Sequence, residues 1–174
     1  MRLVLVLKVI VLSLAVYTGQ AFSQNEELSI KLKALDVVKT QEKGGDELFI
    51  SVSEFPAQGK PLHYQIPSYP THWLSKYLVN VKDVVLWKKQ SSTCMPAELL
   101  ITLVEEDFEP WNMDDAIGSL ELKIDCVNGK AVEKWTIPTQ KSGANVTQQG
   151  NTFTFEGDGA KYKATFSIDS NKTN

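Results

Sequence analysis

Histidine and cysteine are scarce in this sequence, with two of each among 174 residues. A hydrolase needs a nucleophile held against a base, and the two histidines, His63 and His72, both lie in one proline-rich stretch. The Gly-x-Ser-x-Gly elbow, the phosphate-binding P-loop and the Gly-x-Gly-x-x-Gly dinucleotide turn are absent from the sequence. We therefore expect a protein that is not an enzyme and that has no evident small-molecule cofactor.

Concentrated basic charge is also absent. The chain has 18 Lys and Arg against 21 Asp and Glu, a net charge of -3, and its basic residues form no block. A protein that binds nucleic acid gathers basic residues on one face to neutralise phosphates. The composition therefore excludes nucleic acid as a partner.

Long apolar runs are lacking except near the N-terminus. Residues 1–23 combine two basic residues, no acid, an apolar run from Val9 to Val16 and a small-residue end, which is the pattern of a secretory signal peptide. The uncharged run is shorter than the ~20 residues that cross a bilayer as a helix. We expect cleavage after Ser23, with Ala21 as the alternative, and a secreted or periplasmic domain formed by residues 24–174.

The two cysteines, Cys94 and Cys126, therefore belong to a chain that leaves the reducing cytoplasm. An even number of cysteines in an oxidising compartment is more often bridged than free. We predict a disulfide between them, with two buried thiols as the alternative. The bridge would close a loop of roughly 32 residues and contribute on the order of 3 kcal/mol.

Alternating apolar and polar residues dominate the remaining sequence. Residues Ser119–Asp125 (SLELKID) place an apolar residue at every second position, which is the period of a strand with one buried face. Similar runs, separated by turn-forming residues, are Leu28–Val38, Leu48–Val52, Val79–Trp87, Leu99–Val104, Ala131–Ile137, Thr152–Phe155 and Lys161–Ile168. The last two are expected to form a hairpin. These eight or so strands predict an all-β protein, a single antiparallel β-sandwich.

A proline-rich and aromatic stretch from Pro61 to Trp73 interrupts the alternation. Residues that precede proline favour extended or turn geometry, so we expect a long connection or an edge strand. Its aromatic residues, among them Tyr64, Tyr69 and Trp73, either fold back over the edge of the core or form an exposed contact surface. In the second case the surface could bind a small ligand or a glycan.

An acidic segment lies between two of the predicted strands. Six carboxylates fall within eleven residues, at Glu105, Glu106, Asp107, Glu109, Asp114 and Asp115. Such charges repel one another unless the side chains spread into water or a cation gathers them. Calcium accepts six to eight oxygen ligands from a flexible loop, whereas zinc favours His or Cys, which this segment lacks. The alternative is a solvated acidic loop without a metal ion.

The order strand, acid-x-Asp, several residues, Asp-x-Ile-Gly, strand resembles the third calcium-binding loop of C2 domains. Glu105, Asp107, Asp115 and Gly118 stand at the corresponding positions. The segment LKALDVVKTQEKGGDELFISV is similar to the opening strand, first loop and next strand of C2-like modules in exported bacterial proteins. The resemblance implies a C2-like sandwich with calcium ligands at Asp36, Asp46, Glu105, Asp107 and Asp115.

Two aromatic residues, Phe108 and Trp111, lie inside the acidic segment. They either stand exposed at the loop tip, where they would contact a partner or a membrane interface, or pack beneath the loop. We expect an exported, non-catalytic binding module, tuned by calcium, that engages a protein or a membrane surface through this loop. The alternative is a metal-free periplasmic partner protein, of the immunity type or from a secretion system, that presents its acidic face to a basic partner.

Overall fold

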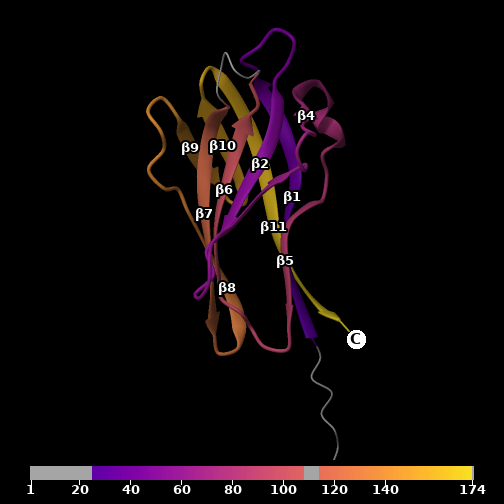
Figure 1. Cartoon of the computed structure of the whole chain (residues 1–174), viewed down its shortest axis with the longest axis vertical. Helices are drawn as coiled ribbons and strands as arrows, with labels where there is room; N and C mark the ends of the chain where they lie inside the picture. Colours follow the sequence, from indigo (N-terminus) through magenta and orange to yellow (C-terminus); the bar gives the residue numbers. More distant parts are fainter. Residues whose placement is uncertain (1–24, 108–113, 174) are drawn as a thin grey trace, which may run out of the picture.

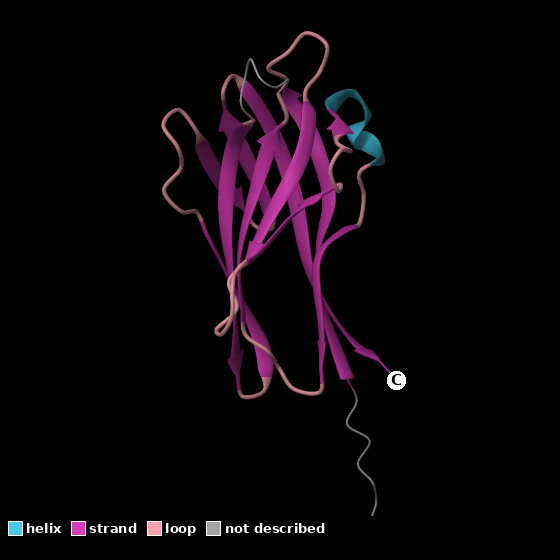
Figure 2. Cartoon of the chain, viewed as in Figure 1, coloured by secondary structure: helices cyan, strands magenta, loops and turns pink. Residues whose placement is uncertain are grey.

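The computed structural model describes residues 25–107 and 114–173, and in this part of the chain it shows eleven strands and one short 3-10 helix. Two antiparallel sheets pack face to face, which confirms the predicted all-β sandwich (Figure 1; Figure 2). The elements are β1 (Asn25–Lys39), β2 (Glu47–Glu54), β3 (Leu62–Ile66), β4 (Trp73–Leu74), η1 (Ser75–Asn80), β5 (Val84–Ser91), β6 (Ala97–Glu105), β7 (Asp115–Val127), β8 (Lys130–Thr136), β9 (Asn145–Gln149), β10 (Thr152–Gly157) and β11 (Ala160–Thr173).

The two sheets divide the chain in an interleaved manner. One sheet has five strands in the order β5-β1-β11-β10-β9, so that the first and last strands of the chain lie side by side. The other has six strands, in the order β3-β2-β6-β7-β8, with β4 also pairing with β2. Strand β4 pairs with the beginning of β2 and β3 with its end, so the two short strands together cover one edge of β2.

The core lies between the sheets and follows the alternation in the sequence. On β6 the inward residues Leu99, Ile101 and Leu103 are buried, because successive side chains of a strand point to opposite faces. The opposite sheet contributes aliphatic residues from β1 and aromatic residues from β10 and β11. Phe153 and Phe166 pack against Trp135, with ring centroids 5.2–5.7 Å apart within this group, a separation typical of favourable aromatic pairs.

Strand β1 keeps its apolar residues inside by means of a bulge. Ile30, Leu32 and Leu35 are all buried, although the last two are three residues apart and a regular strand would place them on opposite faces. The pairing of β1 with β11 shifts between Leu32 and Ala34. The extra residue in the bulge returns Leu35 to the inner face.

Two glycines allow the sheets to approach closely between β7 and β10. A β-carbon on Gly118 would lie 2.6 Å from Cγ2 of Val146, and one on Gly157 would lie 2.7 Å from the carbonyl oxygen of Ile117. Both distances are far shorter than ordinary contacts between carbon or oxygen atoms. Gly118, which the C2 resemblance places at the end of the acidic loop, therefore has a packing role here.

The number of strands differs from the expected eight because three are not marked by alternation. Strands β3 and β4 lie in the proline-rich stretch and are separated by residues around Pro67 and Pro70. This stretch therefore forms the edge of a sheet, which was one of the two expectations for it. Strand β9, with the sequence NVTQQ, is mostly exposed. The predicted strand Val79–Trp87 begins only at Val84, because the helix η1 occupies the residues up to Asn80.

The disulfide between Cys94 and Cys126 is confirmed, with the two Cα atoms 5.9 Å apart. Such a bond is typical of oxidising compartments. No helix in the described ranges has the length and apolar character needed to span a membrane. The predicted signal peptide, residues 1–23, lies outside the described residues.

Candidate metal centre

Three acidic connections meet at one end of the sandwich. The β1–β2 connection extends beyond this end, near the end of β6, the start of β7 and the β10–β11 turn (Figure 1). Strand pairing brings β2, β6 and β7 together here, since Glu105 at the end of β6 pairs with Leu48 on one side and with Asp115 on the other. The segments that meet at this end of the sandwich all carry acidic residues, so carboxylates that are distant in the sequence are brought close together.

Three carboxylates form a compact group, which we call the acidic cluster: Glu42, Glu105 and Asp107. One carboxylate oxygen from each lies within 4.8 Å of the others. The sequence predicted Glu105 and Asp107 as metal ligands but missed Glu42. Glu42 is an exposed residue in the same β1–β2 connection that holds Asp46. Its acidic side chain in that connection is the only feature of the sequence that could have identified it as a ligand.

Glu105 is the most unusual member of the acidic cluster. Its exposed fraction is only 1%, and its Oε2 atom has no hydrogen-bond partner among the described residues. Burial, followed by the nearby charges of Asp107, Asp46 and Glu42, raises the pKa of Glu105 to about 8. A buried carboxylate without a partner is costly in its ionised form, so this position favours a proton or a cation.

Asp107 is held next to Glu105 by its main chain. Its N–H group donates to Oδ1 of Asp114 across the base of the loop, at 3.2 Å. Its own Oδ2 atom is buried and has no hydrogen-bond partner in the part of the chain that the structure describes. The cluster therefore contains two buried carboxylate oxygens, on Glu105 and Asp107, that lack a donor while both groups are ionised. A proton on Glu105 would allow these two side chains to form a hydrogen bond with each other.

A cleft opens beside the acidic cluster, with a volume of about 250 Å³. Besides two members of the cluster it is lined by Glu47, Glu106 and His72. The Nδ1 atom of His72 lies 3.1 Å from Oε2 of Glu106, and the N–H group of Glu106 donates to the carbonyl oxygen of Glu47 at 2.7 Å. The cluster therefore lies beside an acidic surface that a partner can approach.

Asp46 is buried completely, and its carboxylate is already occupied by hydrogen bonds. The backbone N–H groups of Gln41 and Glu42 donate to it at 2.9–3.0 Å, and the hydroxyl of Tyr162 donates to Oδ2. Although the sequence predicted Asp46 as a ligand, its observed contacts are those of a residue that organises the β1–β2 connection.

The other two predicted ligands lie outside the acidic cluster. Asp115 accepts a hydrogen bond from Nζ of Lys141 at 2.9 Å, and the same ammonium lies 2.6 Å from Asp158. Asp36 is exposed on β1, where it pairs with Lys163 of β11. Within the described ranges the acidic cluster includes neither of them.

The predicted contact residues Phe108 and Trp111 lie outside the described residues. The aromatic residues of the proline-rich stretch form no common platform. Tyr64 and Trp73 pack against the core, and the hydroxyl of Tyr64 donates to the carbonyl oxygen of Leu86 at 2.9 Å. Tyr69, in contrast, is 75% exposed. The three residues therefore do not share one surface.

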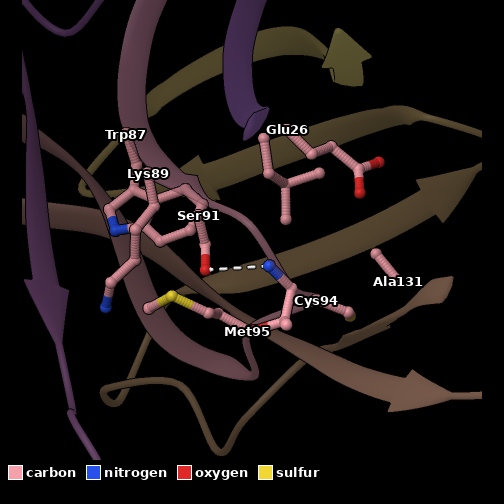
Figure 3. A pocket seen from close by; sticks show the side chains of 9 residues that line it. Glu26, Trp87, Lys89, Ser91, Cys94, Met95 and Ala131 are labelled. Atoms are coloured by element: carbon pink, nitrogen blue, oxygen red, sulfur yellow. Dashed lines mark hydrogen bonds between the residues drawn. The ribbon is translucent and has the colours of Figure 1, made fainter. Parts of the chain in front are cut away.

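A second, more apolar pocket lies near the disulfide, at the opposite end of β6 (Figure 3). Its lining comes from β1, β5, the disulfide segment and β8 and includes Leu28, Trp87, Met95 and Ala131. The room inside it is about 20 Å³, which is on the order of the space needed for one water molecule. This pocket is too small for an organic ligand.

No protein-family model matches the sequence, and the curated proteins contain no match to it. The interpretation of the acidic end therefore depends on its own geometry.

Proposed function

We propose that this chain is an exported, non-catalytic binding module whose acidic cluster binds calcium and engages a protein or membrane surface at that end. The observation that carries the proposal is the buried, unpartnered Oε2 atom of Glu105 next to the carboxylates of Glu42 and Asp107. A cation at this position would offset the repulsion among three carboxylates and supply the partner that the buried oxygen lacks.

Calcium suits this donor set better than the common transition metals. The three members of the acidic cluster offer only carboxylate oxygens, which hard cations prefer, whereas zinc favours nitrogen and sulfur ligands. Calcium accepts six to eight oxygens at flexible geometry, so main-chain oxygens, water or a partner would complete its coordination. Positions left for a partner would make binding to that partner depend on calcium.

The C2-like interpretation agrees with the way the connections gather. The resemblance expects acids from a first loop and from a third loop at one end of a sandwich, and the acidic cluster combines Glu42 of the β1–β2 connection with Glu105 and Asp107 after β6. The disulfide is compatible with export. The C2-like relationship and export through residues 1–23 are parts of the same proposal.

Calcium titration of the protein tests this function directly. At a calcium concentration of about 100 times Kd, a single site that exists only in the folded state stabilises it by about 2.7 kcal/mol. For a domain of this size that corresponds to a rise in Tm of about 5–10 °C. The double variant Glu42→Gln, Asp107→Asn should lose this rise, whereas the exposed Asp36→Asn should keep it. No rise in the wild type at millimolar calcium would refute the metal site.

A second candidate function uses the same surface without a metal ion. The cleft carries Glu42, Glu47, Glu106 and Asp107 on its walls, which would complement a basic partner and give fast, salt-sensitive association. Oligolysine is a suitable probe for this candidate. Binding of oligolysine that persists in a chelator and weakens with salt, together with no response to calcium, would favour the metal-free partner protein.

A further inference from the structure

Asp46 is the centre of a buried network next to the acidic cluster. Its carboxylate accepts hydrogen bonds from the main chain of Gln41 and Glu42 and from the hydroxyl of Tyr162. Its own main chain is bonded to Ser75, which accepts from the Asp46 N–H through Oγ and donates its N–H to the Asp46 carbonyl oxygen, both at 2.8 Å. Three segments of the chain, the β1–β2 connection, the start of η1 and β11, therefore meet at Asp46.

This network controls where the β1–β2 connection lies. Glu42, whose carboxylate belongs to the acidic cluster, is the same residue whose N–H group donates to Asp46 at 2.9 Å. The Glu42 side chain is exposed, so its own packing does little to fix it. Its backbone is held by the hydrogen bond to Asp46 and by a longer one, 3.3 Å, from the N–H group of Gly45 to its carbonyl oxygen.

Tyr162 connects this network to the opposite sheet. It lies on the inner face of β11 and is completely buried, whereas Asp46 immediately precedes β2 in the other sheet. Burial, and then the hydrogen bond to Asp46, raise the pKa of the Tyr162 phenol well above its usual value. The hydroxyl therefore keeps its proton and remains a donor to Asp46.

We propose that Tyr162 positions Glu42 by holding Asp46, and thereby sets the cation affinity of the acidic cluster although Tyr162 touches no cation. The inference rests on the proposed function. Residues that orient metal ligands through hydrogen bonds contribute strongly to affinity, and their loss weakens metal binding by about 10–100-fold. Asp46 in this view is a positioning residue and not a ligand.

The test compares Tyr162→Phe with Tyr64→Phe in the full chain. Each variant keeps its ring and loses its hydroxyl group. The Tyr162 hydroxyl bonds to Asp46 and also interacts with Ser75, whereas Tyr64 donates to the carbonyl oxygen of Leu86 away from the acidic cluster. Calcium affinity is measured by titration calorimetry at a temperature where the wild type and both variants are folded. Tyr162→Phe should bind calcium about 10–100-fold more weakly, and Tyr64→Phe should bind like the wild type.

Amide hydrogen exchange in a calcium chelator gives a second readout that needs no metal ion. Tyr162→Phe should exchange faster at the N–H groups of Gln41 and Glu42, whereas Tyr64→Phe should leave both unchanged. A third variant, Ser75→Ala, removes the other side-chain contact of Asp46 and should act in the same direction as Tyr162→Phe. It allows the test to proceed even if Tyr162→Phe does not fold.

The outcomes separate this inference from the proposed function. If the wild type binds calcium and Tyr162→Phe binds it equally well, the positioning role is wrong. If the wild type does not bind calcium, the proposed function fails, and with it the link to affinity. The positioning of Glu42 is then judged from amide exchange, and unchanged exchange in both Tyr162→Phe and Ser75→Ala would overturn it.

Discussion

Replacing Glu105 with glutamine should change how the stability of the metal-free protein depends on pH. Burial and neighbouring charges raise the pKa of this carboxyl from 4.5 to about 8 in the folded protein. Between these two values the folded protein binds more protons than the unfolded chain, so stability falls as the pH rises. The penalty is absent below the unfolded value of 4.5 and complete above the folded value of about 8.

The size of this effect follows from the pKa difference. Each pH unit between the two values costs at most about 1.4 kcal/mol of unfolding free energy. Raising the pH from about 5 to about 7 should therefore destabilise the wild type by up to about 3 kcal/mol through this one group. Glutamine carries no charge at any pH, so Glu105→Gln should lose this contribution.

Urea unfolding followed by tryptophan fluorescence, in EDTA and over this pH range, measures the effect. The control is Glu98→Gln, which removes an exposed carboxylate from the same strand and should retain the wild-type dependence on pH. The informative quantity is the difference between variant and wild type at each pH, because other groups titrate equally in both. If Glu105→Gln and the wild type show parallel curves, folding does not raise the pKa of Glu105 and the reasoning is refuted.

Two further predictions concern the framework of the sandwich. Replacing Cys94 and Cys126 by serine should lower the unfolding free energy by about 3–4 kcal/mol, because the bridge closes a loop with a sequence separation of 32; a loss below about 1 kcal/mol in urea unfolding would contradict the entropic estimate. Gly157→Ala should destabilise by roughly 1–3 kcal/mol through its contact with the Ile117 carbonyl. Gly44→Ala, with no atom within 4 Å of the new methyl, should leave the unfolding free energy almost unchanged, and equal effects of the two substitutions would argue against the close approach of the sheets.

The strands that the sequence predicted correctly are those whose alternation is local. Residues Ser119–Asp125 lie within β7, and the expected hairpin is formed by β10 and β11. Strand β9 escaped prediction because an exposed edge strand buries little and needs no apolar period. The bulge in β1 likewise has no signature in alternation, although it determines which face Leu35 occupies.

The candidate site was harder to predict because its members depend on contacts between distant segments. Asp46 and Glu42 are equally plausible ligands in the sequence. The hydrogen bond between Asp46 and Tyr162, 116 residues apart, helps to distinguish the buried carboxylate from the one that reaches the cluster. In the same way, Asp115 is engaged by Lys141, 26 residues further along the chain. Local sequence identified the acidic end but not the distribution of roles within it.

The disulfide lies at the opposite end of β6 from the acidic cluster, since Cys94 precedes the first residue of that strand and Glu105 is its last. The two ends of the sandwich therefore respond to different chemical conditions. Reducing conditions act on the end that is covalently closed, whereas acidity acts on the end where Glu105 is buried. The paired strands β6 and β7 run between these two ends of the sandwich. One continuous piece of sheet therefore joins the end that responds to reducing agents to the end that responds to protons.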